Sequence, residues 1–599
     1  MSSVEMVTLT IDGIEVTVPK GTGLVEAALA AGVEIPVFCY EPRLGAPVGA
    51  CRMCLCEVAP GPPKPQAACT LTAAEGMAVK TAATSELAAD AQNATLEFIL
   101  VNHPLDCPVC DKGGECPLQD FSYSFGPDRS RMEFPRRVFD GEGAKADVDF
   151  GPTLMLNRNR CILCTRCVRF MREIDGDAQI GIVARGNGSE IATFEEQGVV
   201  SLLSGNLMDV CPVGAITTRD YRFKARPWDN PQAVDTTCTL CEKGCNTTAW
   251  IKAKPEWAKG ARLIRMTPRL NPDVNSYWMC DIGRFDYHWV EGDRRVHQPR
   301  LQRASGAWDA VPWADALIAV NEAVAAAGGP GAVRFYASAH ASLEELFVLK
   351  QIAGDTGGVT IGWRYREKPQ PKGTKFRIPA VDAPNARGAR DLGFSVPSTI
   401  AGPADVSALR SAVEAGTVKV LYVLDPGPDG SIGDTDWIVA ARKAGTIQTL
   451  IVQTALRTTL AEAADILLAG AAFVEKDATY TNMTGHVQAT SRVLQPPGDA
   501  GEDWQILMKL APVFGANVAY ASASAVRDAI AHSLASVPGY AALREVAFSR
   551  PVSARHWLQA SNPSERWKWD FMFQDLPPVK FGEDFGPIPR AEVIPLRKE

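Results

Sequence analysis

Residues 160–174 read RCILCTRCVRFMREI, and residues 207–217 read LMDVCPVGAIT. The first stretch spaces three cysteines by gaps of two residues, and the second places a fourth cysteine directly before a proline. These four residues are Cys161, Cys164, Cys167 and Cys211. We call them the third group, because two other groups of cysteines precede them in the chain. Cysteine thiolates hold iron–sulfur clusters, usually four to a cluster, and such short gaps are typical of a [4Fe–4S] site. The two stretches therefore predict one cluster site.

The same stretches predict that a second cluster has been lost. In the bacterial ferredoxin pattern a fourth cysteine closes each run, and it binds the cluster of the other run. That closing position is Met171 here, and the other cysteine positions of the second run are Ser201, Ser204 and Leu207. We therefore expect a ferredoxin-like domain with a single [4Fe–4S] cluster.

A second group precedes this domain in the stretch HPLDCPVCDKGGECPLQD, residues 103–120. Its candidate ligands are His103, Cys107, Cys110 and Cys116. An amphipathic helix expected over residues 85–101 would deliver them, and Gly113-Gly114 would let the backbone pass close to the site. One histidine and three cysteines suit a [4Fe–4S] cluster or a zinc ion, and their spacing leaves both open.

The N-terminal segment predicts a hairpin, a helix and then a cysteine-bearing loop. Residues 6–18 alternate as two strands around Asp12-Gly13, a dipeptide typical of hairpin turns. Thr22 is the expected cap of a helix that ends at Gly32. This order resembles the β-grasp fold of plant-type [2Fe–2S] ferredoxins.

The first group of cysteines follows in that loop. Its candidate ligands are Cys39, Cys51, Cys54 and Cys69. Cys56 is an alternative to Cys54, but a gap of two residues can wrap a turn around a cluster, whereas a gap of one in a strand cannot. We therefore expect Cys56 to be a buried free thiol, and zinc stays open as an alternative for the group.

The fourth group also suits a [4Fe–4S] cluster, with zinc as the alternative. Its candidate ligands are Cys238, Cys241, Cys245 and Cys280. The same arrangement opens molybdopterin oxidoreductases, just before their α/β domain. No cysteine follows Cys280, so we expect no molybdenum ligand of the usual kind.

Beyond about residue 300, strands alternate with helices, which favours an α/β domain with a parallel sheet. Ser342 and Glu345 form the capping box of one expected helix. We interpret the Pro-, Gly- and Lys-rich residues 363–400 as a long surface loop. The expected strands are 333–337, 418–424, 448–453 and 465–469.

Composition narrows the class of protein. The 599 residues carry a formal net charge of −8 and no sustained basic run, which gives no support to a nucleic-acid partner. No segment reaches 18 uninterrupted apolar residues, so we expect no membrane-spanning helix. The N-terminus lacks the features of a signal peptide, and a disulfide framework is typical of shorter secreted chains. We expect a cytoplasmic protein.

The three cysteine-rich stretches quoted above resemble the large iron–sulfur subunit of NADH:quinone oxidoreductase, respiratory complex I. The segments PNARGARDLGF (384–394) and FVEKDATYTNMTGHVQ (473–488) resemble the C-terminal domain of that subunit, which is similar to molybdenum-dependent formate dehydrogenases but carries no molybdenum. The resemblance covers most of the chain.

The resemblance implies an electron-carrying subunit with one [2Fe–2S] and three [4Fe–4S] clusters. Electrons would pass from the first group to the third and leave by the second, while the fourth group is off this path. The implied partners are the flavin- and NADH-binding subunit and the quinone-side iron–sulfur subunits. The implied location is the cytoplasmic face of the bacterial inner membrane, reached only through the complex.

The expected fold is multidomain, α/β and α+β. The expected domains are a plant-type ferredoxin (1–83), a [4Fe–4S] domain with one histidine and three cysteines (84–150), a ferredoxin-like [4Fe–4S] domain (151–225), a molybdopterin-oxidoreductase-type [4Fe–4S] domain (226–290) and a molybdopterin-oxidoreductase-like α/β domain without catalytic metal (291–599). The main alternative is a catalytic molybdopterin enzyme such as an NAD-linked formate dehydrogenase. An iron hydrogenase and a zinc-stapled scaffold are weaker alternatives.

Overall fold

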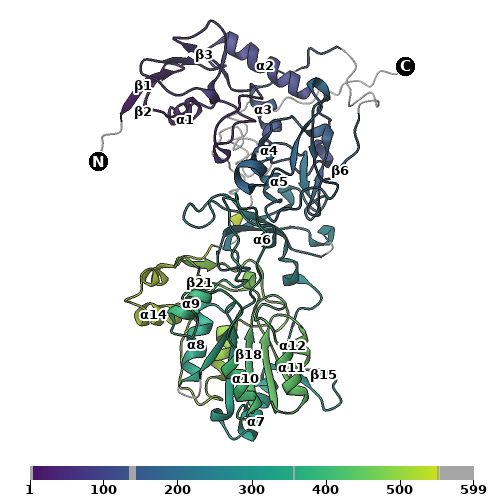
Figure 1. Cartoon of the computed structure of the whole chain (residues 1–599), viewed down its shortest axis with the longest axis vertical. Helices are drawn as coiled ribbons and strands as arrows, with labels where there is room; N and C mark the ends of the chain where they lie inside the picture. Colours follow the sequence, from purple (N-terminus) through teal and green to yellow (C-terminus); the bar gives the residue numbers. More distant parts are fainter. Residues whose placement is uncertain are drawn as a thin grey trace, which may run out of the picture.

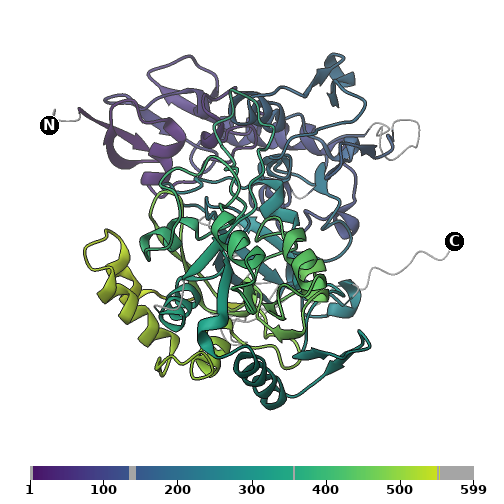
Figure 2. The ribbon, with the colours of Figure 1, turned by 60° about the horizontal axis from the view of Figure 1, so that its bottom comes forward.

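The computed structural model describes residues 5–127, 129–133, 144–258, 260–354, 358–549 and 552–553. The N-terminal, cysteine-rich part lies at one end of the long axis, and the α/β domain lies at the other (Figure 1). The segment around α6 lies between these two parts (Figure 1), and in Figure 2 the purple N-terminal part again lies above the green and yellow α/β part.

The N-terminal domain is a five-stranded sheet with the strand order β2-β1-β5-β3-β4. Its elements are β1 (Met6–Ile11), β2 (Ile14–Pro19), α1 (Leu24–Ala30), β3 (Leu55–Ala59), β4 (Gln66–Ala67) and β5 (Ala78–Lys80). The predicted hairpin is confirmed: β1 and β2 pair antiparallel, and Asp12 and Gly13 have φ angles of 50° and 81°. The predicted cap is wrong. Gly23 is the N-cap of α1, because the Thr22 hydroxyl donates a hydrogen bond to the carbonyl of Pro19 instead.

Two helices lead from this domain to the ferredoxin-like domain. α2 (Glu86–Leu100) confirms the predicted amphipathic helix and is capped by the Ser85 side chain, and α3 is Pro117–Phe125. The ferredoxin-like domain has a three-stranded sheet, a hairpin and two short helices. Its elements are β6 (Val148–Asp149), β7 (Leu154–Leu156), α4 (Arg166–Phe170), β8 (Ile180–Val183), β9 (Glu190–Thr193), α5 (Asn206–Val210) and β10 (Ile216–Thr218).

A four-stranded antiparallel sheet carries most of the fourth group. Its strands are β11 (Gln232–Thr237), β12 (Asn246–Ile251), β13 (Leu263–Pro268) and β23 (Val552–Ser553). Cys280 follows this sheet and immediately precedes α6 (Asp281–Phe285). Apolar side chains of the sheet, such as Val234 and Ala249, share one core with Phe473 and Val474 of the α/β domain.

The C-terminal part confirms the predicted parallel α/β domain. Its seven-stranded sheet has the order β15-β14-β20-β19-β18-β16-β17, in which the strands from β20 to β17 are parallel and the other two add an antiparallel edge. The sheet strands are β14 (Arg300–Gln302), β15 (Trp308–Ala310), β16 (Val333–Ser338), β17 (Val359–Gly362), β18 (Val420–Asp425), β19 (Thr449–Thr454) and β20 (Ile466–Ala469). The predicted strands thus agree with the structure to within two residues.

Helices cover both faces of this sheet. One core contains side chains of α7 (Trp313–Ala326), α8 (Leu343–Ala353), α13 (Asp503–Leu510) and α14 (Ala523–Ser533). The other core contains side chains of α10 (Ser407–Glu414), α11 (Asp436–Lys443) and α12 (Thr459–Glu462). A separate hairpin of β21 (Ala478–Thr481) and β22 (Val487–Thr490) packs beside α8.

The interpretation of residues 363–400 as a surface loop is wrong. The segment contains α9 (Ala386–Asp391), in which Ala386 and Ala389 are fully buried. Gly388 lets α9 approach α8, because a Cβ there would lie 2.7 Å from the Leu343 Cδ2 atom. The Pro, Gly and Lys residues of the segment suggest an exposed loop, but the segment also contains a short apolar helix face that packs in the α/β core.

Candidate metal centres

The loop after α1 brings the first group together. The Cys39 amide donates to the Cys51 Sγ atom at 3.4 Å, and the Cys51 amide donates back to the Cys39 Sγ atom at 3.4 Å. The thiols of Cys51 and Cys69 both donate to Cys39, and these contacts lower the pKa of the Cys39 thiol. The thiol of Cys54 is hydrogen-bonded to Cys69, so all four side chains meet.

Cys56 lies apart from this group. It belongs to β3, is 1% exposed and packs in the apolar core of the N-terminal domain. Burial raises the pKa of its thiol to about 12. The geometry therefore brings Cys54, and not Cys56, to the other three cysteines.

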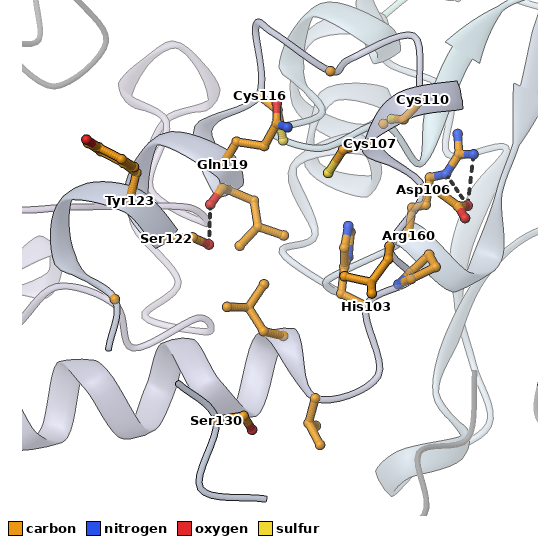
Figure 3. A pocket seen from close by; sticks show the side chains of 18 of the residues that line it. His103, Asp106, Cys107, Cys110, Cys116, Gln119, Ser122, Tyr123, Ser130 and Arg160 are labelled. Carbon is orange, nitrogen blue, oxygen red and sulfur yellow. Dashed lines mark hydrogen bonds and ion pairs between the residues drawn. The ribbon is translucent and has the colours of Figure 1, made fainter. Parts of the chain in front are cut away.

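The second group lines a cavity of about 560 Å³ between α2, α3 and the loop that joins them (Figure 3). His103 follows α2, Cys107 begins a 3₁₀ turn and Cys116 precedes α3. The Nδ1 atom of His103 is buried and has no hydrogen-bond partner, so it is free to bind a metal. Burial, reinforced by the charge of Arg160, lowers the pKa of His103 to about 4, and the imidazole is neutral at pH 7. Neutral imidazole is the form that binds metals.

A glycine outside the second group shapes it. A Cβ atom at Gly214 would lie 2.0 Å from the Cys110 Sγ atom, so a larger residue there would displace that sulfur. We expected Gly113-Gly114 to bring the backbone close to the site, and Gly113 does line the cavity. Gly214 belongs to the distant stretch that also carries Cys211, and nothing in its local sequence links it to Cys110.

The third group lines a small cavity with apolar walls that include Leu156 and Ile216. Leu163 and Thr165, between the cysteines, have φ angles of 52° and 63°. These left-handed conformations cost energy and occur where the surroundings impose them. Here they wrap the chain around the cavity, and the Leu163 amide donates to the Cys161 Sγ atom at 3.4 Å.

Burial makes these thiols poor acids in the absence of a metal. It raises the pKa of Cys161 to about 11 and that of Cys164 to about 12. A metal ion reverses this preference, because a coordinated thiol is deprotonated. Three buried thiols and the half-buried thiol of Cys161 around one cavity therefore fit a cationic iron–sulfur core.

Other side chains occupy the positions of the second ferredoxin cluster. Met171 and Leu207 are fully buried among apolar residues. The Ser201 hydroxyl donates to Asp175 at 2.5 Å, and the Ser204 hydroxyl donates to Asp281 at 2.5 Å. Packing and hydrogen bonds thus take the place of thiolates there.

The fourth group lines another small cavity, and all four of its thiols are buried. A Cβ at Gly283 would lie 2.9 Å from the Cys238 Sγ atom, so α6 approaches the group through a glycine. Lys368 also lines this cavity and pairs with Asp382 at 2.6 Å. Sequence reasoning missed Lys368, because it lies in the segment interpreted as a surface loop.

The third group adjoins each of the other three. Arg169 on α4 donates to the Cys39 carbonyl of the first group at 3.0 Å. The Cys116 Sγ atom of the second group lies 3.8 Å from the Pro212 carbonyl oxygen, one residue beyond Cys211. The rings of Phe170 and Trp278, which lie near the third and fourth groups, have centroids 5.1 Å apart. The third group thus contacts the first, although the second group lies between them in the sequence.

The second, third and fourth groups each line a cavity, and the four side chains of the first group meet one another. Among the described residues, no three His, Cys, Asp or Glu side chains converge tightly enough to hold a single metal ion. The described chain also contains no helix that is long and apolar enough to cross a bilayer.

Four family models match the chain. They are "2Fe-2S iron-sulfur cluster binding domain" over residues 4–84, "NADH-ubiquinone oxidoreductase-G iron-sulfur binding region" over 92–131, "NADH-quinone oxidoreductase subunit 3, ferredoxin-like domain" over 151–217 and "Molybdopterin oxidoreductase" over 385–513. The chain thus contains 2Fe-2S, 4Fe-4S and molybdopterin-oxidoreductase-like domains in that order.

Relatives in bacteria, plants and fungi match the chain. A subunit of the NADH-quinone oxidoreductase of Streptomyces coelicolor is 42% identical over 55% of this chain and 37% of its own length. The mitochondrial NADH dehydrogenase [ubiquinone] iron-sulfur protein 1 of Solanum tuberosum is 42% identical over 53% of this chain and 40% of its own length. The alignments with these two relatives thus span less than half of their length.

Among solved structures, a chain of the NAD+-reducing [NiFe]-hydrogenase in its H2-reduced state is 30% identical, with a TM-score of 0.32 over 37% of this chain and 90% of that one. The 78 kDa subunit of NADH-ubiquinone oxidoreductase of Neurospora crassa is 31% identical over 87% of this chain and 82% of its own length. Because that alignment spans most of both chains, this chain belongs to the family of the large iron–sulfur subunit of NADH:quinone oxidoreductase, which includes the bacterial relative and the fungal 78 kDa subunit.

Proposed function

We propose that this chain is the electron-transfer subunit of a proton-translocating NADH:quinone oxidoreductase. It would carry electrons from a flavin-bearing subunit toward quinone and would bind no substrate of its own. The observation that carries this proposal is the arrangement of four ligand groups with the third in contact with the rest. Family membership supports it, and the catalytic formate dehydrogenase alternative has no counterpart among the relatives named above.

The donor sets fit one [2Fe–2S] and three [4Fe–4S] clusters. The first group takes the two-iron cluster, and the other three groups take the four-iron clusters. The unpartnered Nδ1 atom of His103 supports the assignment of one histidine and three cysteines to the second group. Bound iron–sulfur clusters supply one-electron transfer at potentials set by ligand charge, hydrogen bonds and burial.

The contacts favour a route from the first group through the third to the second. Arg169 holds the Cys39 backbone against α4, which carries Cys167. The Pro212 carbonyl joins the backbone beside Cys211 to the thiol of Cys116. The fourth group adjoins the third through the Phe170 and Trp278 rings and through Asp281, the residue after Cys280, which accepts a hydrogen bond from Ser204, and we place it as a branch off this route.

The surface beside the second group favours a docking partner. Cys107 is exposed there, and Leu105 and Val109 are 80% and 58% exposed. Exposed apolar side chains around a redox site suit a protein contact that excludes water. We assign this face to the quinone-side iron–sulfur subunits, and we assign the face beside the first group to the flavin- and NADH-binding subunit. The chain would reach the cytoplasmic face of the inner membrane through these partners alone.

Metal analysis of the purified full-length chain, with EPR of its reduced form, tests the proposal. One two-iron and three four-iron clusters predict about 14 iron atoms per chain and four distinct signals. Cys245→Ala should remove about four of those iron atoms and one signal, while the other three signals remain. A colourless chain loaded with zinc, or one molybdenum atom per chain, would contradict it.

A further inference from the structure

Arg169 is a buried cation at the contact between the first and third groups. It lies on α4, two residues after Cys167, and is 3% exposed. One terminal nitrogen of its guanidinium donates to the Cys39 carbonyl at 3.0 Å. The other donates to carbonyls of residues 44–46, at 3.3 Å to Leu44, 3.4 Å to Gly45 and 2.8 Å to Ala46.

The charge of Arg169 has no carboxylate partner among the described residues, whereas those of its neighbours do. Arg166, one helical turn earlier, lies 3.7 Å from a Glu41 carboxylate oxygen. Arg160, beside Cys161, lies 2.9 Å from Asp106. In the described part of the chain, Arg169 donates instead to neutral carbonyls of the loop that carries Cys39.

An uncompensated buried cation is costly unless a negative charge lies close to it. Thiolate ligands give the first group such a charge, and reduction of a cluster adds one more. A fixed positive charge nearby stabilises the reduced form more than the oxidised form. It therefore raises the reduction potential of that centre.

We propose, on the basis of the function proposed above, that Arg169 is a positioning residue that raises the reduction potential of the [2Fe–2S] cluster held by the first group. It does so through its fixed charge beside Cys39. The step concerned adds one electron delivered by the reduced flavin-bearing partner subunit. No bond forms or breaks and no proton moves, and Arg169 keeps its charge throughout.

Three substitutions test this inference in the full-length, iron-loaded chain. Arg169→Gln removes the buried charge, and Arg169→Lys keeps it but loses the planar fork. Arg172→Gln is the matched control, because it removes the same charge from an arginine whose side chain is 63% exposed. Iron content and EPR-monitored redox titration of the [2Fe–2S] signal are measured for each variant.

We expect Arg169→Gln to keep its iron and to lower the reduced-to-oxidised ratio of the [2Fe–2S] centre about tenfold at a fixed potential. Such a change corresponds to a midpoint about 59 mV more negative for a one-electron couple. Arg169→Lys should stay within about threefold of wild type, and Arg172→Gln should be unchanged, because water screens an exposed charge.

An unchanged midpoint in an iron-replete Arg169→Gln variant overturns the inference, as does an equal shift in Arg172→Gln. If Arg169→Gln does not retain its cluster, Arg169→Lys decides. A near-wild-type [2Fe–2S] midpoint in Arg169→Lys then supports the role of the charge. A tenfold change in its reduced-to-oxidised ratio, with full iron content, overturns the inference. Absence of the [2Fe–2S] signal in wild type would instead overturn the proposed function itself.

Discussion

At the scale of a single residue, Gly214 lies between two candidate metal centres. Its Cα faces Cys110 of the second group, while its chain neighbours lead back to Cys211 of the third. We expect Gly214→Ala to displace the Cys110 sulfur, because the new Cβ would lie 2.0 Å from it. The variant should lose about four iron atoms and the EPR signal of the second group, and should keep the other signals.

Gly188→Ala is the matched control for this prediction. It makes the same change in the same domain, where the nearest atom to a new Cβ is 4.0 Å away. Iron content should not change in this variant. Full iron and an intact second-group signal in Gly214→Ala would show that Cys110 does not serve as a ligand in the orientation seen here.

At the scale of elements, the sequence predicts the turns and helix caps that depend on residues close together in the chain. The turn at Asp12-Gly13 and the Ser342 capping box are predictable because their signals lie within four residues. The cap predicted at Thr22 is wrong because capping depends on where a hydroxyl points, and here it points to Pro19. The burial of α9 escapes prediction because it depends on α8, which is distant in sequence. The same reasoning explains Gly214 and Lys368, whose roles come from tertiary contacts.

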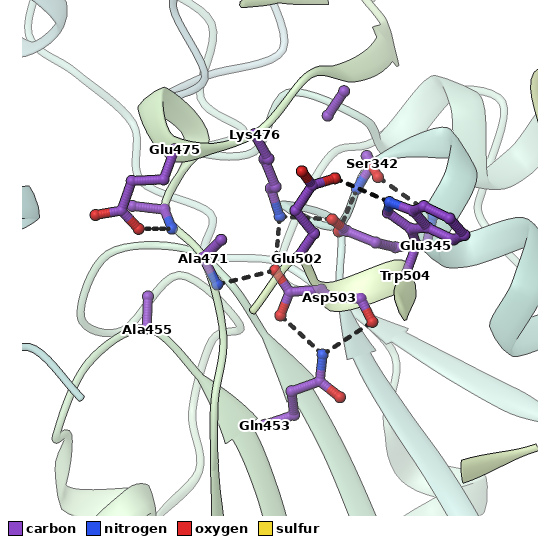
Figure 4. A network of polar contacts seen from close by, with 12 residues as sticks. Ser342, Glu345, Gln453, Ala455, Ala471, Glu475, Lys476, Glu502, Asp503 and Trp504 are labelled. Carbon is purple, nitrogen blue, oxygen red and sulfur yellow. Dashed lines mark hydrogen bonds and ion pairs between the residues drawn. The ribbon is translucent and has the colours of Figure 1, made fainter. Parts of the chain in front are cut away.

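One buried polar network joins three elements of the α/β domain (Figure 4). Lys476 lies 2.5 Å from Glu345 on α8 and 2.9 Å from Asp503 on α13. The single Lys476 ammonium group is thus paired with two fully buried carboxylates. Burial, reinforced by the charge of Asp503, raises the pKa of Glu345 to about 7.

This raised pKa predicts how the domain responds to pH. Folded Glu345 holds its proton up to about pH 7, whereas an unfolded glutamate loses it near its ordinary pKa of 4.5. Between these values the folded state binds more protons, so its contribution to stability falls as pH rises, by at most about 3 kcal/mol. Hydrogen exchange of the α8 amides, corrected for the intrinsic rate, should therefore show weaker protection at pH 7.5 than at pH 5.

Glu345→Gln should remove most of this pH dependence, because glutamine cannot titrate and leaves Lys476 paired with Asp503 alone. Glu414→Gln is a suitable control, since Glu414 pairs with Arg410 on the exposed side of α10. It should leave the α8 profile unchanged. Protection that is independent of pH in wild type would contradict the prediction.

At the scale of the whole molecule, the two ends of the long axis differ in what their cores are made of. The core of the ferredoxin-like region includes the candidate ligands Cys116, Cys167 and Cys211, together with Cys238, Cys245 and Cys280 of the fourth group. The two cores of the α/β sheet contain no cysteine among their described members. Metal binding and folding are coupled where ligands form the core, so loss of iron should act on one end of the molecule.

Limited proteolysis of chain produced with and without iron tests this difference. Without iron we expect rapid cleavage before about residue 230 and survival of a C-terminal fragment, which retains the β11–β13 sheet because Val234 and Ala249 pack against Phe473 and Val474. The iron-loaded chain is the control, and its N-terminal part should resist the protease at least tenfold longer. Mass spectrometry of the fragments locates the cleavage sites. Equal resistance of the N-terminal part in both preparations would contradict the prediction. It would show that apolar packing holds this part together without help from bound iron.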